Sequence, residues 1–211
     1  MSIDSVRSPE LTPEIKQQLV TQLGSQLHDE WRAPRKISIQ EIDRQLMQAA
    51  EDNREASLAS WGTQSHQENS SRALANELQT RRDYLAGLGS KEVFEPRIKA
   101  TKDEAWKAAR GVEKVDIANT SFADLPSDWQ GENRAAAEVA MGELFRQVES
   151  GGLLDDSFVE QAAATVHDKW LERNGSWAPA EQNKPFEELS EEEKEKDRVQ
   201  VRKAIELYEA L

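Results

Sequence analysis

An internal repeat is the feature that most constrains the fold of this chain. The segment 122–134 recurs as 186–198, at an offset of 64 positions (186 − 122), with a phenylalanine, a leucine and an arginine at matching places. The segment 27–31 recurs as 166–170 with the order His-Asp-x-Trp, at an offset of 139 positions (167 − 28). The unequal offsets indicate that one copy is continuous and that the other is split by an insertion. Because each copy needs a neighbour to bury its apolar face, we predict that the two copies pack as a pseudo-twofold pair.

The continuous copy, 157–211, has the pattern of two amphipathic helices. The first is predicted to begin with a capping box formed by Ser157 and Glu160 and to stop at Gly175. The second is predicted to begin at Ser190, three positions before a glutamate that completes another capping box. The predicted inward residues are Val159, Ala162, Ala163, Val166 and Trp170 in the first helix, and Val199, Ala204, Leu207 and Leu211 in the second.

The split copy is predicted to comprise 12–35 and 116–149. Its first part begins with Thr12 as a cap and Pro13 at the first helical position, and its second part ends before a Gly-Gly pair. Apolar residues at helical spacing follow each start, so each part is predicted to form one helix. Those of the first part are Ile15, Leu19, Val20, Leu23, Leu27 and Trp31.

The insertion, 36–115, is predicted to be mostly helical. One helix is expected from about residue 38 and another from about 71 to 88, separated by a polar break at 63–69, and Thr101 is expected to cap a short third helix. The first of the two longer helices is predicted to continue through Leu46, Met47, Ala50 and Leu58. The predicted inward residues of the second are Leu74, Leu78, Tyr84 and Leu85. The predicted fold class is therefore all-α, with tandem pseudo-twofold helical repeats and a helical insertion.

The charge of the chain limits its partners. The 211 residues include 40 acidic and 27 basic ones, which gives a net charge of −13, and there is no cysteine. A negative protein repels a phosphate backbone and an anionic membrane surface, so we expect neither nucleic acid nor membrane as a partner. No apolar leader pattern and no run of about eighteen apolar residues occurs, which leads us to expect a cytoplasmic protein.

The sequence lacks the common catalytic patterns. Thiol chemistry is excluded, and neither a G-x-S-x-G motif nor a nucleotide-binding glycine motif is present. The adjacent His28 and Asp29 cannot chelate one metal ion, since neighbouring helical residues point about 100° apart. We therefore expect no catalytic residue, no metal and no cofactor. An enzyme whose residues converge from distant segments remains an open alternative.

The continuous copy resembles the ryanodine-receptor repeat. The resemblance rests on the His-x-x-Trp pattern of the first helix, on Asn-Gly-Ser-Trp at 174–177, and on P-F-x-x-L-x-x-x-E-K-x-x-D-R at 185–198. It covers about 55 residues of the continuous copy and, more loosely, both parts of the split copy. It implies an all-helical tandem with a regulatory role, and one such pair is known to bind adenine nucleotides.

The resemblance and the residue chemistry together give a set of candidate ligand-binding residues. Tryptophan faces stack on bases and arginine forks clamp phosphates, so a purine nucleotide or a nucleotide-like signal is the expected ligand. The candidates are His28, Trp31, Arg134, His167, Trp170, Trp177 and Arg198.

Each candidate also has a structural interpretation. The tryptophans fit a core position, the histidines fit structural hydrogen bonds to neighbouring groups, and the arginines fit ion pairs with helix acids. At the level of function, the alternative to a nucleotide module is an acidic protein-interaction module that contacts a basic protein partner.

Overall fold

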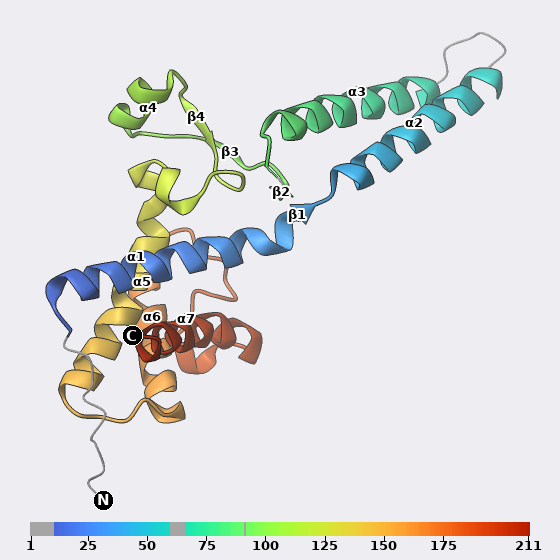
Figure 1. Cartoon of the computed structure of the whole chain (residues 1–211). Coiled ribbons are helices and arrows are strands. Elements are labelled where there is room, and N and C mark those ends of the chain that lie inside the picture. Colours follow the sequence, from blue (N-terminus) through green and yellow to red (C-terminus); the bar gives the residue numbers. More distant parts are fainter. Residues whose placement is uncertain (1–10, 60–65, 91) are drawn as a thin grey trace, which may run out of the picture. The chain divides into compact units, whose positions relative to one another are not determined.

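The computed structural model describes residues 11–59, 66–90 and 92–211, and helices dominate this part of the chain (Figure 1). The predicted all-α class is confirmed, with two small antiparallel strand pairs added. In chain order the elements are α1 (Pro13–Arg32), η1 (Ala33–Arg35), β1 (Lys36–Ile37), α2 (Ile39–Ala59), α3 (His66–Gly87), β2 (Val93–Phe94), β3 (Ile98–Ala100), α4 (Glu104–Arg110), β4 (Lys114–Asp116), η2 (Phe122–Asp124), α5 (Ser127–Glu149), α6 (Asp156–Asn174), η3 (Phe186–Glu188) and α7 (Glu191–Glu209).

The chain divides into two compact units. The first combines the residues up to Trp31 with Ile98–Leu211, and the second is Arg32–Arg97. The predicted insertion, 36–115, therefore runs beyond the second unit, because β3, α4 and β4 belong to the first. None of the described helices has the length and apolar run needed to cross a membrane.

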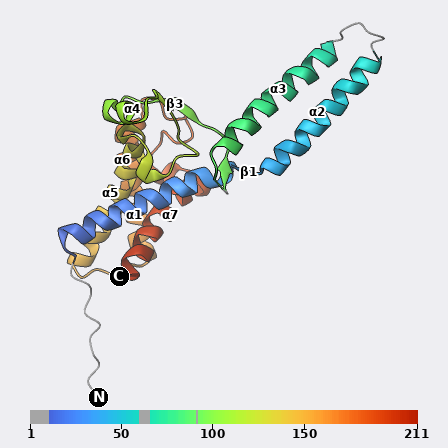
Figure 2. The ribbon, with the colours of Figure 1, turned by 45° about the horizontal axis from the view of Figure 1, so that its top comes forward.

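The first unit is built around one helical core. Helices α5, α6 and α7 pack against one another, and α1 adds a stripe of apolar residues to the same cluster (Figures 1 and 2). Burying such apolar side chains is the main favourable contribution to folding. The buried members are Leu19, Val20, Leu23, Leu27, Ala137, Ala140, Met141, Leu144, Phe145, Phe158, Val159, Ala162, Ala163, Val166, Phe186, Leu189, Val201 and Ala204.

The predicted inward faces of α1 and α6 are confirmed except at their tryptophans, since Trp31 is 37% exposed and Trp170 is only partly buried. The predicted inward face of α7 also needs correction. Leu211 is 55% exposed, whereas Val201, which was not predicted to face inward, is fully buried. The buried face of α7 runs through Asp197, Val201 and Ala204, which follow a helical spacing of four and three positions. A charged residue at the start of this face obscured it in the sequence.

Two of the predicted helix-capping residues are confirmed, and two are wrong. Thr12 Oγ1 accepts from the Ile15 backbone N–H, and Ser190 caps α7. Helix α6, however, is capped by Asp155, one residue before the helix, and α4 is capped by Asp103. In both cases the carboxylate accepts from the backbone N–H three positions later, the geometry that a capping side chain requires.

A smaller apolar cluster lies beside the β3–β4 pair. Its buried residues are Val115, Ile117, Phe122 and Leu125, with Trp106 and Trp129 packed against them. Both indole N–H groups donate to backbone carbonyls, Trp106 to Asp124 and Trp129 to Ala100. The strand Lys114–Asp116, which pairs with Ile98–Ala100, was not predicted from the sequence.

The second unit is a hairpin of α2 and α3 joined at its base by the β1–β2 pair (Figures 1 and 2). The buried residues of its apolar cluster are Ile42, Ala49, Leu78, Leu85 and Val93. Helix α2 continues through Met47 and Leu58 as predicted, and both side chains are exposed, at 70% and 71%. Leu74 and Tyr84 are also exposed, so their predicted inward positions are wrong. Helix α3 begins at His66, so the predicted polar break is helical over 66–69, and its remainder, 63–65, lies outside the described residues.

Candidate functional site

Each of the two predicted His-x-x-Trp segments forms a stacked ring pair. The His28 ring is buried and stacks on Trp31 with 5.8 Å between centroids, and its Nε2 lies 3.0 Å from the Thr120 carbonyl oxygen. His167 is also buried, stacks on Trp170 at 6.1 Å, and has Nε2 at 2.8 Å from the Lys184 carbonyl oxygen.

These contacts recur at the two offsets found in the sequence. The rings are related by 139 positions, and the carbonyls that they contact, at 120 and 184, are related by 64. Each histidine ring also tilts against the phenylalanine that opens a 3-10 helix, Phe122 in η2 and Phe186 in η3. Both histidines therefore contact backbone carbonyls, as their structural interpretation predicted.

Hydrogen-bond chemistry fixes the proton on one side of the His167 ring. A carbonyl oxygen can only accept, so Nε2–H donates to Lys184 and Nδ1 is left to face Asp197. The Nδ1–Oδ2 distance is 3.3 Å. Both atoms are acceptors unless one of them carries a proton, so a hydrogen bond between them requires a proton on one of the two.

Asp197 has an environment that favours keeping this proton. Burial raises the pKa of Asp197 to about 6, although His167 opposes the shift, and nearby Glu193 adds to it. The carboxyl group thus belongs to a buried polar pair in the first half of α7.

A pocket of about 350 Å³ opens beside this pair. Its lining combines two indole rings with a polar wall that includes two acidic side chains. The residues are Trp31 from α1, His167 and Trp170 from α6, Gln182 from the following loop, Leu189, and Glu193, Lys196, Asp197 and Gln200 from α7. An ion pair of 2.9 Å between Lys203 and Glu30 ties the end of α1, and with it Trp31, to α7.

The polar wall is rich in hydrogen-bond acceptors. Glu193 accepts from Gln182 Nε2 at 2.9 Å and from Lys196 Nζ at 2.5 Å. Gln200 Nε2 lies 3.3 Å from Asp197 Oδ1, while the buried Gln200 Oε1 has no hydrogen-bond partner among the described residues. A ligand that donates hydrogen bonds suits this wall better than one that accepts them.

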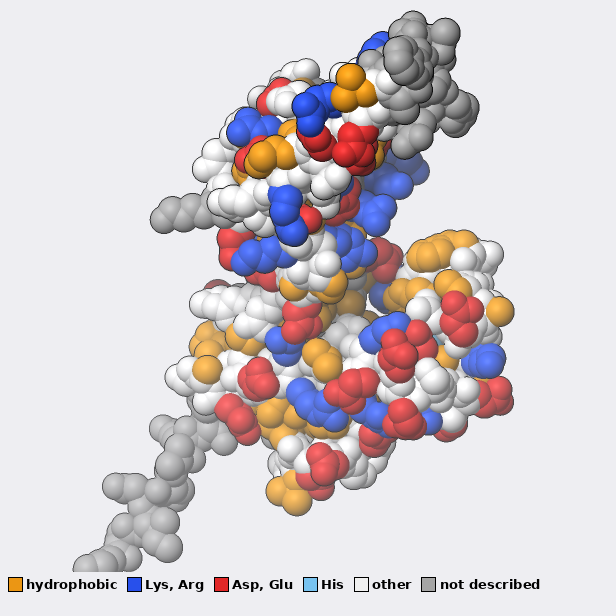
Figure 3. All heavy atoms as spheres, turned by 90° about the vertical axis from the view of Figure 1, so that its right-hand side faces the viewer, with side chains coloured by type: hydrophobic (Ala, Val, Ile, Leu, Met, Phe, Trp, Pro, Cys, Tyr) orange, Lys and Arg blue, Asp and Glu red, His pale blue; other side chains and the backbone are white. Residues whose placement is uncertain are grey.

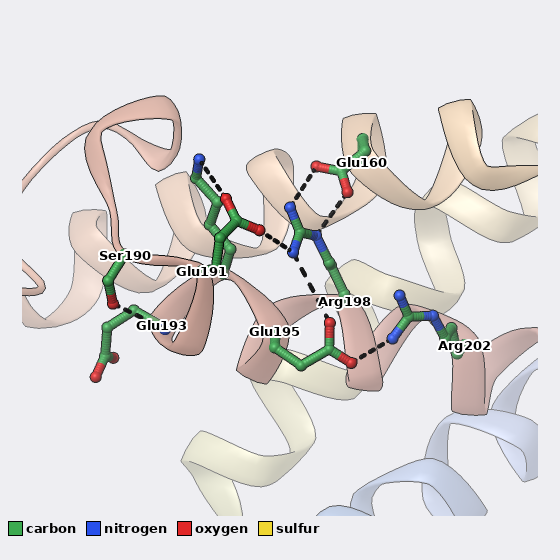
Figure 4. A network of polar contacts seen from close by, with 8 residues as sticks. Glu160, Ser190, Glu191, Glu193, Glu195, Arg198 and Arg202 are labelled. Carbon is green, nitrogen blue, oxygen red and sulfur yellow. Dashed lines mark hydrogen bonds and ion pairs between the residues drawn. The ribbon is translucent and has the colours of Figure 1, made fainter.

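The two predicted arginines lie away from this lining. Arg198 is enclosed by carboxylates, with Nε at 2.6 Å from Glu160 and Nη1 at 2.8 Å from Glu191, and Glu195 completes the group (Figure 4). Hydrogen bonds to Glu160 and Glu191 raise the pKa of Arg198. Arg134 lies 3.9 Å from Glu138 on the same helix. Both follow the structural interpretation, as partners of helix acids.

The predicted set is therefore brought together only in part. Trp31, His167 and Trp170 line one pocket, and His28 stacks behind Trp31. Trp177 is 66% exposed and meets Trp170 edge-on at 6.0 Å.

Sequence reasoning missed the acceptors on α7, namely Glu193, Asp197 and Gln200. The available signal was the position of Asp197, four residues before Val201 on the buried face.

Comparisons with protein families, with curated proteins and with solved structures find no match for this chain. Within the described residues no group of three or more histidine, aspartate or glutamate side chains could hold a metal ion.

Proposed function

We propose that this chain is a non-catalytic binding module that contacts a positively charged segment of a partner protein, with the tryptophan-lined pocket as the anchoring point. The observation that carries the proposal is the pocket wall, where two indole rings stand beside Glu193 and Asp197. Aromatic faces and carboxylates both attract cations.

The pocket supports a cationic partner better than a nucleotide. Any nucleotide brings at least one phosphate, and Glu193 and Asp197 would face it. Lys196, the one lysine or arginine among the described lining residues, is already paired with Glu193. The arginines that were expected to clamp a phosphate are engaged elsewhere. A purine could still stack on the indoles, but its phosphate would find carboxylates instead of guanidinium groups.

The overall charge supports the same partner. With a net charge of −13, the chain attracts a basic protein over several ångströms and so raises the rate of encounter. On the face shown in Figure 3, acidic and basic side chains are interspersed, and no continuous basic stripe marks a nucleic-acid footprint. Long-range attraction then comes from the net charge and selectivity from the pocket.

Calorimetry with simple charged probes tests this proposal. A decalysine peptide, a decaglutamate peptide and a panel of purine nucleotides are titrated into the full chain at about 50 and about 300 mM salt. We expect decalysine to bind, more weakly at high salt, and decaglutamate and the nucleotides to give no heat. Nucleotide binding without decalysine binding would overturn the proposal.

A further inference from the structure

We infer that the pocket receives the terminal cation of a single lysine or arginine side chain, held between indole faces and carboxylate oxygens. This inference rests on the proposed function, since it names the chemical group of the partner that enters the site. Three features of the lining support it, namely the rings, the acceptors and an internal cation that already occupies part of the wall.

The indole rings supply the aromatic part of the site. Trp31 is 37% exposed and Trp170 is partly buried, so both lining rings keep surface available to a ligand. Trp170 contacts the His167 ring by stacking and the Trp177 ring in a T-shaped pair. A cation within about 6 Å of an indole centroid is attracted by the electron-rich face, and indole is the strongest of the aromatic side chains in this respect.

The acceptors supply the polar part. Glu193 and Asp197 side chains are only 17% and 13% exposed, so their oxygens are poorly screened by solvent. Hydrogen bonding from Lys196 lowers the pKa of Glu193, which keeps this carboxylate ionised. Gln200 Oε1 adds a buried acceptor beside Asp197. Ammonium and guanidinium groups carry three and five N–H donors, which such a wall can satisfy.

Lys196 acts as an internal stand-in for the ligand. Its ammonium group sits on Glu193 at 2.5 Å, which shows that an alkylammonium fits against this carboxylate. The Lys196 side chain is 55% exposed, so it can swing into solvent when a ligand cation arrives. The pocket volume of about 350 Å³ is near the lower end of small-molecule sites, which run from about 300 to 1,000 Å³, and suits one long side chain.

Matched small molecules test the charge requirement. N-acetyl-arginine amide and N-acetyl-lysine amide are titrated into the full chain by calorimetry, with N-acetyl-citrulline amide as the neutral isostere of the arginine probe. We expect both cations to bind and citrulline to bind at least about tenfold more weakly, as loss of a charged hydrogen bond requires. Equal binding of the arginine and citrulline probes would overturn the inference.

Matched variants test the location. Glu193→Gln should weaken the arginine probe by about tenfold, since it removes a charged acceptor. Glu192→Gln, which removes the same charge from the exposed neighbouring position, should change the affinity by less than about twofold. Trp170→Leu should weaken binding by about fivefold through loss of the ring. Lys196→Ala should strengthen it, because the competing ammonium is gone, whereas Lys169→Ala, an exposed lysine paired with Glu172, should not.

The two proposals fail in different ways. Decalysine binding that is unchanged in Glu193→Gln and Trp170→Leu would overturn the pocket inference while leaving the protein-interaction proposal in place. Binding of the small cations without decalysine binding would overturn the protein-interaction proposal and leave the pocket. Thermal unfolding of each variant verifies that the fold is retained.

Discussion

Replacing Asp197 with asparagine tests the hydrogen bond that we infer between His167 and α7. The Lys184 carbonyl occupies the Nε2–H side of the imidazole, so Nδ1 and Asp197 Oδ2, 3.3 Å apart, share one proton. When that proton leaves at higher pH, two acceptors face each other in a buried place. An asparagine amide instead donates to the neutral Nδ1 and keeps the hydrogen bond.

The expected change in the free energy of unfolding follows from the pKa of the Asp197 carboxyl group. Burial raises the pKa of Asp197 from 3.8 to about 6. A group whose pKa is raised by folding contributes stability that is fully present below its unfolded pKa and lost as the pH rises through its folded pKa. Each pH unit between the two values corresponds to about 1.4 kcal/mol, so the loss is on the order of 3 kcal/mol between about pH 4 and pH 6.

Denaturant unfolding of the wild type and of Asp197→Asn at pH 4, 5, 6 and 7 measures this loss. We expect the wild type to lose on the order of 3 kcal/mol relative to the variant across this range. Asp168→Asn, an exposed change beside His167, is the control and should stay within about 0.5 kcal/mol of the wild type. A wild type whose stability relative to Asp197→Asn is constant or rises with pH would refute the shared proton.

Three further substitutions have defined outcomes. Leu23→Ala empties a fully buried site in the core and should cost about 3 kcal/mol in chemical denaturation, whereas Leu153→Ala, at a 75% exposed position, should cost less than about 0.5 kcal/mol. Gly24→Ala places a methyl group 2.9 Å from the Phe122 ring and should destabilise the chain by about 1–3 kcal/mol, seen as a lower Tm. Arg198→Gln should leave affinity for the arginine probe within about twofold by calorimetry, since Arg198 is outside the pocket lining, and a larger loss would contradict that placement.

Much of the helical core could be predicted because its residues follow a local rule. The stripe of α1 and that of α6 repeat every three or four positions, and apart from Trp31 and Trp170 these are the residues that lie in the core. The short strands could not be predicted in this way. β3 and β4 have only three residues each, and they form by pairing with each other across the sequence rather than through local preference.

The candidate site could be predicted only where the repeat marked it. His167 and Trp170 stood out because His28 and Trp31 match them, and each pair does stack. The arginines matched equally well in sequence, but a spacing rule cannot tell whether a guanidinium group faces a cavity or its own helix acids. The relation to the ryanodine-receptor repeat, and the tandem arrangement it implies, stay predictions.

The acidic composition of this part of the sequence concealed the hydrogen-bond acceptors that line the pocket. Between 187 and 197 the sequence is so acidic that Glu193 and Asp197 look like ordinary members of a solvated face. The folded chain separates them from their neighbours, because the loop after α6 and the end of α1 cover this part of α7. Burial, which depends on contacts distant in sequence, makes these two carboxylates different from the rest.

The indole N–H signals of the six tryptophans offer the most direct test of the pocket. In nitrogen-15 labelled protein titrated with N-acetyl-arginine amide, we expect the signals of Trp31 and Trp170 to shift together and to saturate at the same concentration. The signals of Trp106 and Trp129 should stay in place, since their N–H groups are bonded to backbone carbonyls away from the pocket. Shifts confined to Trp106 and Trp129, or no shift of Trp31 and Trp170 at a concentration where calorimetry detects binding, would contradict the account.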